Sequence, residues 1–171
     1  MARSKTPSPQ EFTANADWLR LDQQLCFALY ASSLAMTKLY KPLLEPLGLT
    51  YPQYLVMLVL WEQEGISVST LGQRLSLDSG TLTPLLKRME AAGLIARRRA
   101  AEDERRVDIF LSPAGQALKT QALHIPPRLA CANACSLEEL SSLTRRLHEL
   151  RQQLVKAADL PSPPTTTDHK E

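Results

Sequence analysis

Hydrophobic residues in the first part of the chain recur at steps of three and four positions. The series comprises Trp18, Leu21, Leu25, Leu29, Met36 and Leu39, with Ser32 and Ser33 in register. This spacing is typical of an amphipathic helix. Pro42 is expected to end or kink the helix, because a residue before proline avoids the helical conformation. The pattern therefore predicts a long helix from about Trp18 to Pro42.

A second helix is predicted to open at Thr50, with Pro52 in its first turn, where a missing N–H is tolerated. Apolar residues cover much of its circumference, namely Tyr54, Leu55, Leu58 and Trp61. A helix of this kind belongs at the centre of a core. Gly65 is expected to end it, and Ile66-Ser67 reads as a short extended segment able to pair with a later hairpin.

The next segments predict two helices and a hairpin. A short helix is expected from Val68 to Leu75. Asp78 or Ser79 then caps a helix that runs to Ala92, with Leu82, Leu85, Leu86 and Met89 on its apolar face and Pro84 near its start. Alternation at 94–98 and 106–111 predicts strands, with 99–105 as the hairpin tip. This order is typical of a winged helix-turn-helix, which places one helix in a DNA groove and a basic hairpin beside it.

The C-terminal third is again helical. Ser112-Pro113 begins a helix that runs toward Ile125, where Pro126-Pro127 interrupts it, and a further helical stretch carries Cys131 and Cys135. Ser136 and Glu139 form a capping box for a last helix whose leucines make one stripe: Leu137, Leu140, Leu143, Leu147, Leu150 and Leu154. The stripe packs either against the chain's own core or against a second subunit. We favour the second, because readers of two-fold DNA sites are dimers.

The expected fold class is mainly α with a small β-wing, a winged helix-turn-helix with N- and C-terminal dimerisation helices. The expected divisions are a disordered arm at 1–15, a dimerisation and sensing region at 16–47, the DNA-binding domain at 48–112, dimerisation helices at 113–158 and a disordered tail at 159–171. Pro7, Pro9 and the Pro/Thr-rich end favour the disordered assignments.

Composition narrows the class of protein only slightly. The chain has 171 residues, a net charge of +2 and three cysteines. Its longest apolar run, Tyr54 to Trp61, is far too short to span a bilayer, and Met1–Gln10 lacks the apolar core of a signal peptide. We therefore expect a cytoplasmic protein with reduced thiols, without a membrane partner, cofactor or metal.

The start of the predicted recognition helix carries small hydrogen-bonding residues that can approach base edges, with cations further along. The alternative is that Asp78, Ser79 and Thr81 only cap a core helix. In the hairpin, five arginines crowd into ten residues, and Asp103 can hold one arginine while another stays available for the minor groove or backbone. A solvated hairpin is the alternative. The predicted DNA contacts are Asp78, Ser79, Gly80, Thr81, Thr83, Lys87, Arg88, Arg99, Asp103, Arg105 and Arg106.

The run from Leu75 to Glu90, then Gly93-Leu94-Ile95, then Asp103-Glu104-Arg105-Arg106, resembles the MarR family of transcriptional regulators. Within that family it is similar to the organic-hydroperoxide-sensing branch, the OhrR type, and the similarity extends from about Leu21 to Leu154. The resemblance implies a homodimeric repressor that binds double-stranded DNA at a pseudo-palindromic operator and responds to organic hydroperoxides.

The same resemblance assigns roles around the thiols. Cys26 matches the cysteine that reacts with peroxide, Tyr30 a nearby tyrosine, and Tyr40 and Tyr51 two tyrosines that reach the sulfur from the other subunit. Cys131 matches the cysteine that captures oxidised Cys26 across the dimer, which releases the operator. Cys135 reads as a spare, an alternative resolving cysteine or a core residue. The alternative for Cys26 itself is a small buried hydrophobe.

Three other functions compete with this hypothesis. The chain could be a MarR-type regulator that responds to a small aromatic ligand and has inert cysteines. It could be a thiol peroxidase, although no Pro/Thr/Cys/Arg constellation surrounds Cys26. It could also be an architectural DNA-binding protein without an effector. We expect a regulator rather than an enzyme.

Overall fold

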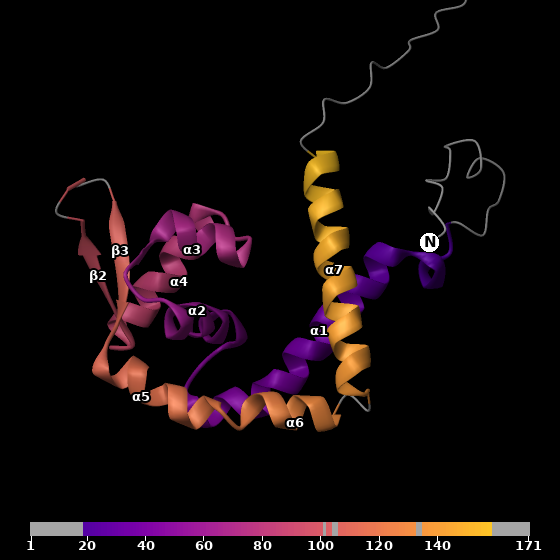
Figure 1. Cartoon of the computed structure of the whole chain (residues 1–171), viewed down its shortest axis with the longest axis horizontal. Helices are drawn as coiled ribbons and strands as arrows, with labels where there is room; N and C mark the ends of the chain where they lie inside the picture. The colour runs from indigo at the N-terminus through magenta and orange to yellow at the C-terminus, as the bar shows by residue number, and fades with distance from the viewer. Residues whose placement is uncertain (1–18, 101, 104–105, 133–134, 159–171) are drawn as a thin grey trace, which may run out of the picture. The chain divides into compact units, whose positions relative to one another are not determined.

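The computed structural model describes residues 19–100, 102–103, 106–132 and 135–158 (Figure 1). These residues form helices α1 to α7 and a three-stranded sheet, which confirms the mainly α fold class with a small β-wing. The chain divides into two compact units, the first ending at Ile125 and the second beginning at Pro126.

Helix α1 spans Leu25–Leu44 and differs from the prediction at both ends. A 3₁₀ turn at Leu21–Gln23 and an extended Gln24 precede it, so the helix does not continue back through Leu21; Trp18 lies outside the described residues. Pro42 does not end the helix, which continues to Leu44. Leu44 is only 1% exposed, and its burial in the core offsets the backbone hydrogen bond that Pro42 cannot donate.

Helix α2 spans Tyr51–Glu62 and is the central helix, as predicted. The backbone N–H of Thr50 donates to Gln53 Oε1 at 2.8 Å, which fixes its start. Its buried residues are Tyr54, Val56, Met57, Val59 and Leu60. Gly65 does not end α2 directly. It adopts a φ of +73° and donates its N–H to Ile109 O at 2.8 Å, so it begins the path into the sheet.

Helices α3 (Val68–Leu75) and α4 (Ser79–Ala91) form the helix-turn-helix. The turn is tight: Ser76 has a φ of 56°, and Leu77 N–H donates to Gly72 O at 2.9 Å. A Cβ on Gly72 would lie 2.8 Å from Leu77 O, so only glycine fits without a backbone shift. The predicted apolar face of α4 is confirmed, because Leu82, Leu85, Leu86 and Met89 are all buried.

The sheet has the order β1-β3-β2 and is antiparallel throughout. Strand β1 (Ile66–Ser67) pairs with β3 (Val107–Leu111), which confirms the predicted pairing. Strand β2 spans Ile95–Arg99. Arg99 pairs with Val107, so it belongs to the strand and not, as predicted, to the hairpin tip.

Helix α5 (Pro113–Ala122) is tied to α2 and to the base of the hairpin. Ser112 caps it through a bond from Gly115 N–H at 3.0 Å. Trp61 Nε1 donates to Gly115 O at 3.1 Å, and a Cβ on Gly115 would meet Leu94 O at 2.1 Å. These contacts hold α5 in the first compact unit. The expected role of α5 among the dimerisation helices at 113–158 stays a prediction.

The second unit contains α6 (Ile125–Ala132), which begins at the boundary, and α7 (Leu137–Ala158). Pro126 and Pro127 open α6 instead of merely interrupting a helix, because first-turn N–H groups have no helical partner. Cys131 lies in α6, whereas Cys135 lies beyond its end, so the two do not share one helix as predicted. Ser136 and Glu139 form the predicted capping box. No residue of α7 is buried.

Among the described residues, no single helix combines the length and apolar character needed to cross a membrane. The pair Leu25–Leu47 and Tyr51–Glu62, bent by 69°, passes that test by length and composition when taken together.

Candidate functional site

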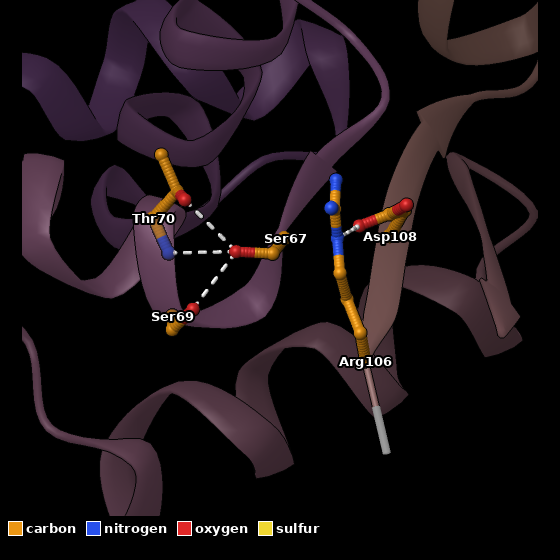
Figure 2. Close-up of polar contacts among 5 residues, drawn as sticks. All are labelled: Ser67, Ser69, Thr70, Arg106 and Asp108. Atoms are coloured by element: carbon orange, nitrogen blue, oxygen red, sulfur yellow. Dashed lines mark hydrogen bonds and ion pairs between the residues drawn. The ribbon is translucent and has the colours of Figure 1, made fainter. Parts of the chain in front are cut away.

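A groove with polar and apolar lining residues lies between α3, the start of α4 and the hairpin. It has a volume of about 1170 Å³ and is open to solvent. Ser67, Ser69, Thr70, Gln73 and Ser76 line one side, Asp78, Ser79 and Thr83 the start of α4, and Arg97, Asp103 and Arg106 the hairpin side. Figure 2 shows Ser67 at the α3 side and Arg106 on the strand side. The structure thus brings the predicted recognition helix and the predicted wing to one surface.

The start of α4 is organised by Asp78. Its Oδ1 accepts from Thr81 N–H at 2.9 Å, and its Oδ2 accepts from the Thr81 hydroxyl at 2.9 Å. These bonds, from the backbone first and the hydroxyl second, lower the pKa of Asp78. Asp78 and Thr81 therefore cap the helix, and their contact with DNA stays a prediction. Because a Cβ on Gly80 would lie 3.0 Å from Asp78 Oδ1, a small residue there keeps the cap undisturbed.

Other predicted contacts on α4 point outward from the same helix. Ser79 is exposed and Thr83 half-buried, and both line the groove. Lys87 and Arg88 are exposed further along the helix. This arrangement offers hydroxyls near the helix start and cations along its side, as recognition of base edges and phosphates requires.

The hairpin contains two arginine–carboxylate pairs that the sequence analysis did not identify. Glu90 of α4 accepts from Arg97 N–H at 3.0 Å and from Arg97 Nε at 2.8 Å, and these bonds lower the pKa of Glu90. Arg106 Nε lies 2.8 Å from Asp108 Oδ1 (Figure 2). The sequence offered a signal for the first pair, because Glu90 and Arg97 have opposite charges and lie seven positions apart on either side of the short turn between α4 and β2.

The tip of the hairpin carries the remaining predicted wing residues. Arg106 N–H donates to Asp103 O at 2.9 Å. Arg105 lies outside the described residues, so an arginine held by the Asp103 carboxylate stays a prediction. Arg99 is exposed and shares a shallow hollow with Arg98, whose guanidinium carbon lies 4.9 Å from the Phe110 ring centroid.

A hydroxyl cluster at the start of α3, formed by Ser67, Ser69 and Thr70, lines the groove and was missed in the sequence. Ser67 Oγ accepts from Thr70 N–H at 3.1 Å and lies 2.8 Å from the hydroxyl oxygens of Ser69 and Thr70 (Figure 2). A serine directly before the Val68 helix start was the available signal, since serine is a favoured cap.

The thiol site begins with Cys26, the second residue of α1. Cys26 is exposed, so within this chain it is not packed as a small core residue. Tyr30, one turn later, is 61% exposed. Cys131 and Cys135 are exposed as well and belong to the second unit.

Tyr40 and Tyr51 form a pair with ring centroids 4.6 Å apart, and Tyr54 lies 5.7 Å from Tyr40. Burial raises the pKa of Tyr40 to about 12, with further contributions from the Tyr51 and Tyr54 phenols. Burial also raises the pKa of Tyr51. Both phenols therefore keep their protons at neutral pH and can act as hydrogen-bond donors.

Cys26 and this tyrosine pair are far apart within one chain. Cys26 and Tyr40 lie on the same helix α1, and fourteen positions at a rise of ~1.5 Å correspond to roughly 21 Å. No hydrogen bond spans that distance. The structure brings Tyr40 and Tyr51 together but keeps both away from the Cys26 of their own chain.

Comparisons with known proteins give the family. The family model described as Transcriptional regulator SarA/Rot matches residues 38–122. The organic hydroperoxide resistance transcriptional regulator of Bacillus subtilis is 52% identical over 81% of this chain and 94% of its own length. Reduced AbfR bound to DNA has a TM-score of 0.71 at 34% identity, covering 84% of this chain and 99% of that one. AbfR is a protein of Staphylococcus epidermidis.

A disulfide form of AbfR also matches, with a TM-score of 0.55 at 35% identity over 78% of this chain and 94% of that chain. The winged-helix fold, the predicted motifs and the identity to the Bacillus subtilis regulator agree. The chain belongs to the MarR family of transcriptional regulators, in the branch of the organic hydroperoxide resistance regulators.

Proposed function

We propose that this protein is a cytoplasmic, homodimeric repressor that binds a pseudo-palindromic operator through α4 and the hairpin. It senses organic hydroperoxides through Cys26. Oxidised Cys26 then forms a disulfide with Cys131 of the partner subunit, and the dimer releases DNA. The observation that carries the proposal is the exposed Cys26 at the start of α1, far from the tyrosine pair of its own chain.

The groove supports the DNA-binding part. The hydroxyls at the start of α4 suit base edges, and the hairpin arginines suit phosphates or a narrow minor groove. Similar proteins point the same way, since AbfR has been captured on DNA. Phosphate contacts would make binding strongly dependent on salt.

The thiol chemistry follows from the position of Cys26. Peroxides react with the thiolate, and the first turn of a helix favours a negative charge. The thiolate attacks the terminal oxygen of the hydroperoxide, so the O–O bond breaks, an alcohol leaves and Cys26 becomes a sulfenic acid. The thiol of the partner's Cys131 then displaces that oxygen as water and forms the disulfide. Two electrons pass from the two thiols to the peroxide.

The dimer is needed for the tyrosines to act. Because Tyr40 and Tyr51 lie beyond reach of their own Cys26, only a second copy can present them to the sulfur. The un-ionised phenols would donate hydrogen bonds to the thiolate, which favours its charged form. Disulfide formation brings the two cysteine Cα atoms to about 4.4–6.8 Å, and any larger starting separation forces the helices that carry them to move.

The experiment compares reduced and hydroperoxide-treated protein on a non-reducing denaturing gel. Wild type should give a dimer band that dithiothreitol removes. Cys26→Ser and Cys131→Ser should each abolish the band, whereas the matched variant Cys135→Ser should keep it. Absence of the band from wild type, or its loss only in Cys135→Ser, would contradict the Cys26–Cys131 pairing.

A parallel assay tests DNA release. Duplexes selected from a random-sequence library by the reduced protein are titrated before and after treatment with cumene hydroperoxide. Binding should fall after treatment and return with dithiothreitol, and Cys26→Ser should stay bound. If Cys26→Ser responds as wild type does, Cys26 is not the sensor, and the alternative of a regulator that binds a small aromatic ligand gains support.

A further inference from the structure

The pair formed by Glu90 and Arg97 links the helix that carries the recognition residues to the hairpin. Glu90 lies near the end of α4 and Arg97 in the middle of β2. One carboxylate oxygen accepts the backbone N–H of Arg97 at 3.0 Å, and the other accepts Nε at 2.8 Å. Two bonds to one carboxylate fix both the strand and the direction of the guanidinium.

Arg97 faces the groove and not the outer surface of the wing. In β2, Ile95 is buried, and residues two apart share one face of a strand, so Arg97 shares the face that meets α4. Its neighbour Arg98 lies on the opposite face against Phe110. Arg97 lines the same groove as Ser79, Thr83 and Arg106.

The bonds to Glu90 do not use the terminal nitrogens of Arg97. Guanidinium nitrogens Nη1 and Nη2 carry donors in a planar fork suited to phosphate. The side chains of Arg97 and Glu90 are 29% and 37% exposed, so the fork is held at a partly shielded position beside the groove. An arginine fixed in this way loses less rotamer entropy on binding than an unrestrained surface arginine.

We propose that Arg97 contacts a DNA phosphate from within the groove and that Glu90 is the residue that positions it. The inference rests on the proposed DNA binding and adds a contact on the inner face of the wing to those predicted at α4 and the hairpin tip. Glu90 touches no DNA in this proposal; it acts through the orientation of Arg97 and through the tie between α4 and β2.

The alternative is that the pair is only a structural tie. Another arginine pair of the same unit provides a matched comparison, because Arg74 bonds to Glu62. The Arg74 side chain is 37% exposed, and Arg74 does not line the groove. Removal of either arginine takes away one cation and breaks one ion pair. Only removal of Arg97 should alter phosphate contacts.

The test titrates reduced wild type, Arg97→Ala, Arg97→Lys and Arg74→Ala against a selected duplex over a range of salt concentrations. Each neutralised phosphate contributes a slope of about 0.9 to the fall of log K with log salt. Because the proposed dimer carries two copies of Arg97, Arg97→Ala should lower the slope by about 1.8, while Arg74→Ala should leave it unchanged. Arg97→Lys, which keeps the charge but not the fork, should retain the slope and bind more weakly.

A second measurement separates contact from folding. Duplexes that carry a neutral methylphosphonate at one position are scanned along both strands. For wild type, a methylphosphonate at one phosphate of each half-site should lower the affinity. Arg97→Ala, which already lacks that contact, should show no additional loss at the same position. Glu90→Gln should lower the DNA affinity when Arg97 is present. It should not change the affinity in the Arg97→Ala background, as expected for a residue that acts through Arg97.

Several results would overturn the proposal. If Arg97→Ala has the same salt slope and methylphosphonate pattern as wild type, Arg97 does not contact a phosphate and its pair with Glu90 is only a structural tie. Tighter binding by Glu90→Gln would mean that Glu90 merely neutralises Arg97. If wild type itself binds no selected duplex, the proposed DNA binding fails, a result distinct from failure of the Arg97 contact. Circular dichroism and gel filtration confirm that each variant is folded and has the same oligomeric state.

Discussion

Helices α2 and α7 show two opposite ways of using hydrophobic residues. Helix α2 has 12 residues and buries five of them, whereas α7 has 22 residues and buries none. Helix α2 is apolar over most of its surface and α7 carries one leucine stripe, yet α2 is covered by its own unit and the leucines of α7 remain accessible. Leu143 and Leu147 are 53% and 41% exposed.

The same contrast divides α1 from the helix-turn-helix. Leu25, Phe27, Tyr30, Leu34 and Met36 are exposed on α1, while every apolar residue predicted for the α4 face is buried. Soluble monomers seldom expose so much apolar surface. The comparison indicates that the winged helix closes its own core, whereas α1 and α7 leave apolar faces that we expect a second copy to cover.

The largest expected effect comes from a charge on the α7 leucine stripe. If a second copy covers the stripe, Leu147→Glu removes apolar burial and places a carboxylate in an apolar contact in each of the two copies. The dimer dissociation constant should then rise roughly a hundredfold or more. Gln152→Glu, on the opposite side of α7, should change it little. Sedimentation equilibrium measures both, and an unchanged dimer in Leu147→Glu would mean that the stripe is not an interface.

Glycine substitutions test how closely the winged helix is packed. Gly115→Ala should cost about 3 kcal/mol of unfolding free energy and Gly72→Ala roughly 1–3 kcal/mol, because each Cβ meets a backbone carbonyl. At Gly80 the nearest atom belongs to the Asp78 side chain, so Gly80→Ala should stay within about 0.5 kcal/mol. Urea titration gives the order, and equal losses at all three positions would refute the packing argument.

Trp61 tests whether α5 is held by a specific hydrogen bond. Trp61→Phe keeps an aromatic ring but removes the donor to Gly115 O, with an expected cost of about 1 kcal/mol. Lys119→Met removes the bond from Nζ to Trp61 O at 2.9 Å, which is more exposed and should cost less. If thermal unfolding ranks the two variants the other way, ring packing rather than the Trp61 hydrogen bond fixes α5.

The smallest effect concerns the pH dependence of the α4 cap. The pKa of Asp78 is lowered in the folded state by bonds from Thr81. Its stabilisation is therefore fully present above the unfolded pKa of about 3.9 and is lost as the pH falls through the lower folded value. Asp78→Asn should flatten the acid side of the stability curve, and Thr81→Ala should flatten it partly. If the free energy of unfolding falls equally with decreasing pH in wild type and both variants, Asp78 is not the group responsible.

Local rules predicted much of the winged helix and the start of α7, because these signals lie within a few residues of each other. The Thr50 start of α2, the Asp78 cap of α4 and the Ser136–Glu139 capping box each join groups three positions apart. Two of the proline predictions were less accurate, whereas Pro52 and Pro113 lie in the first turns of α2 and α5 as predicted. Helix α1 passes through Pro42, and Pro126-Pro127 opens a helix, because tertiary burial or a first-turn position outweighs the local preference.

The candidate site divides in the same way. Sequence pattern predicted the residues at the start of α4, whereas the tie between Glu90 and Arg97 and the approach of the Ser67 hydroxyl cluster to the hairpin residues of the groove became apparent only from the packed elements. Local hydrogen-bonding groups and hydrophobic spacing thus determined the elements and their caps. Tertiary structure decided how Glu90 and Arg97 tie α4 to β2, that Gly115 faces Leu94 O and which apolar faces stay open, because those outcomes depend on contacts between separate elements.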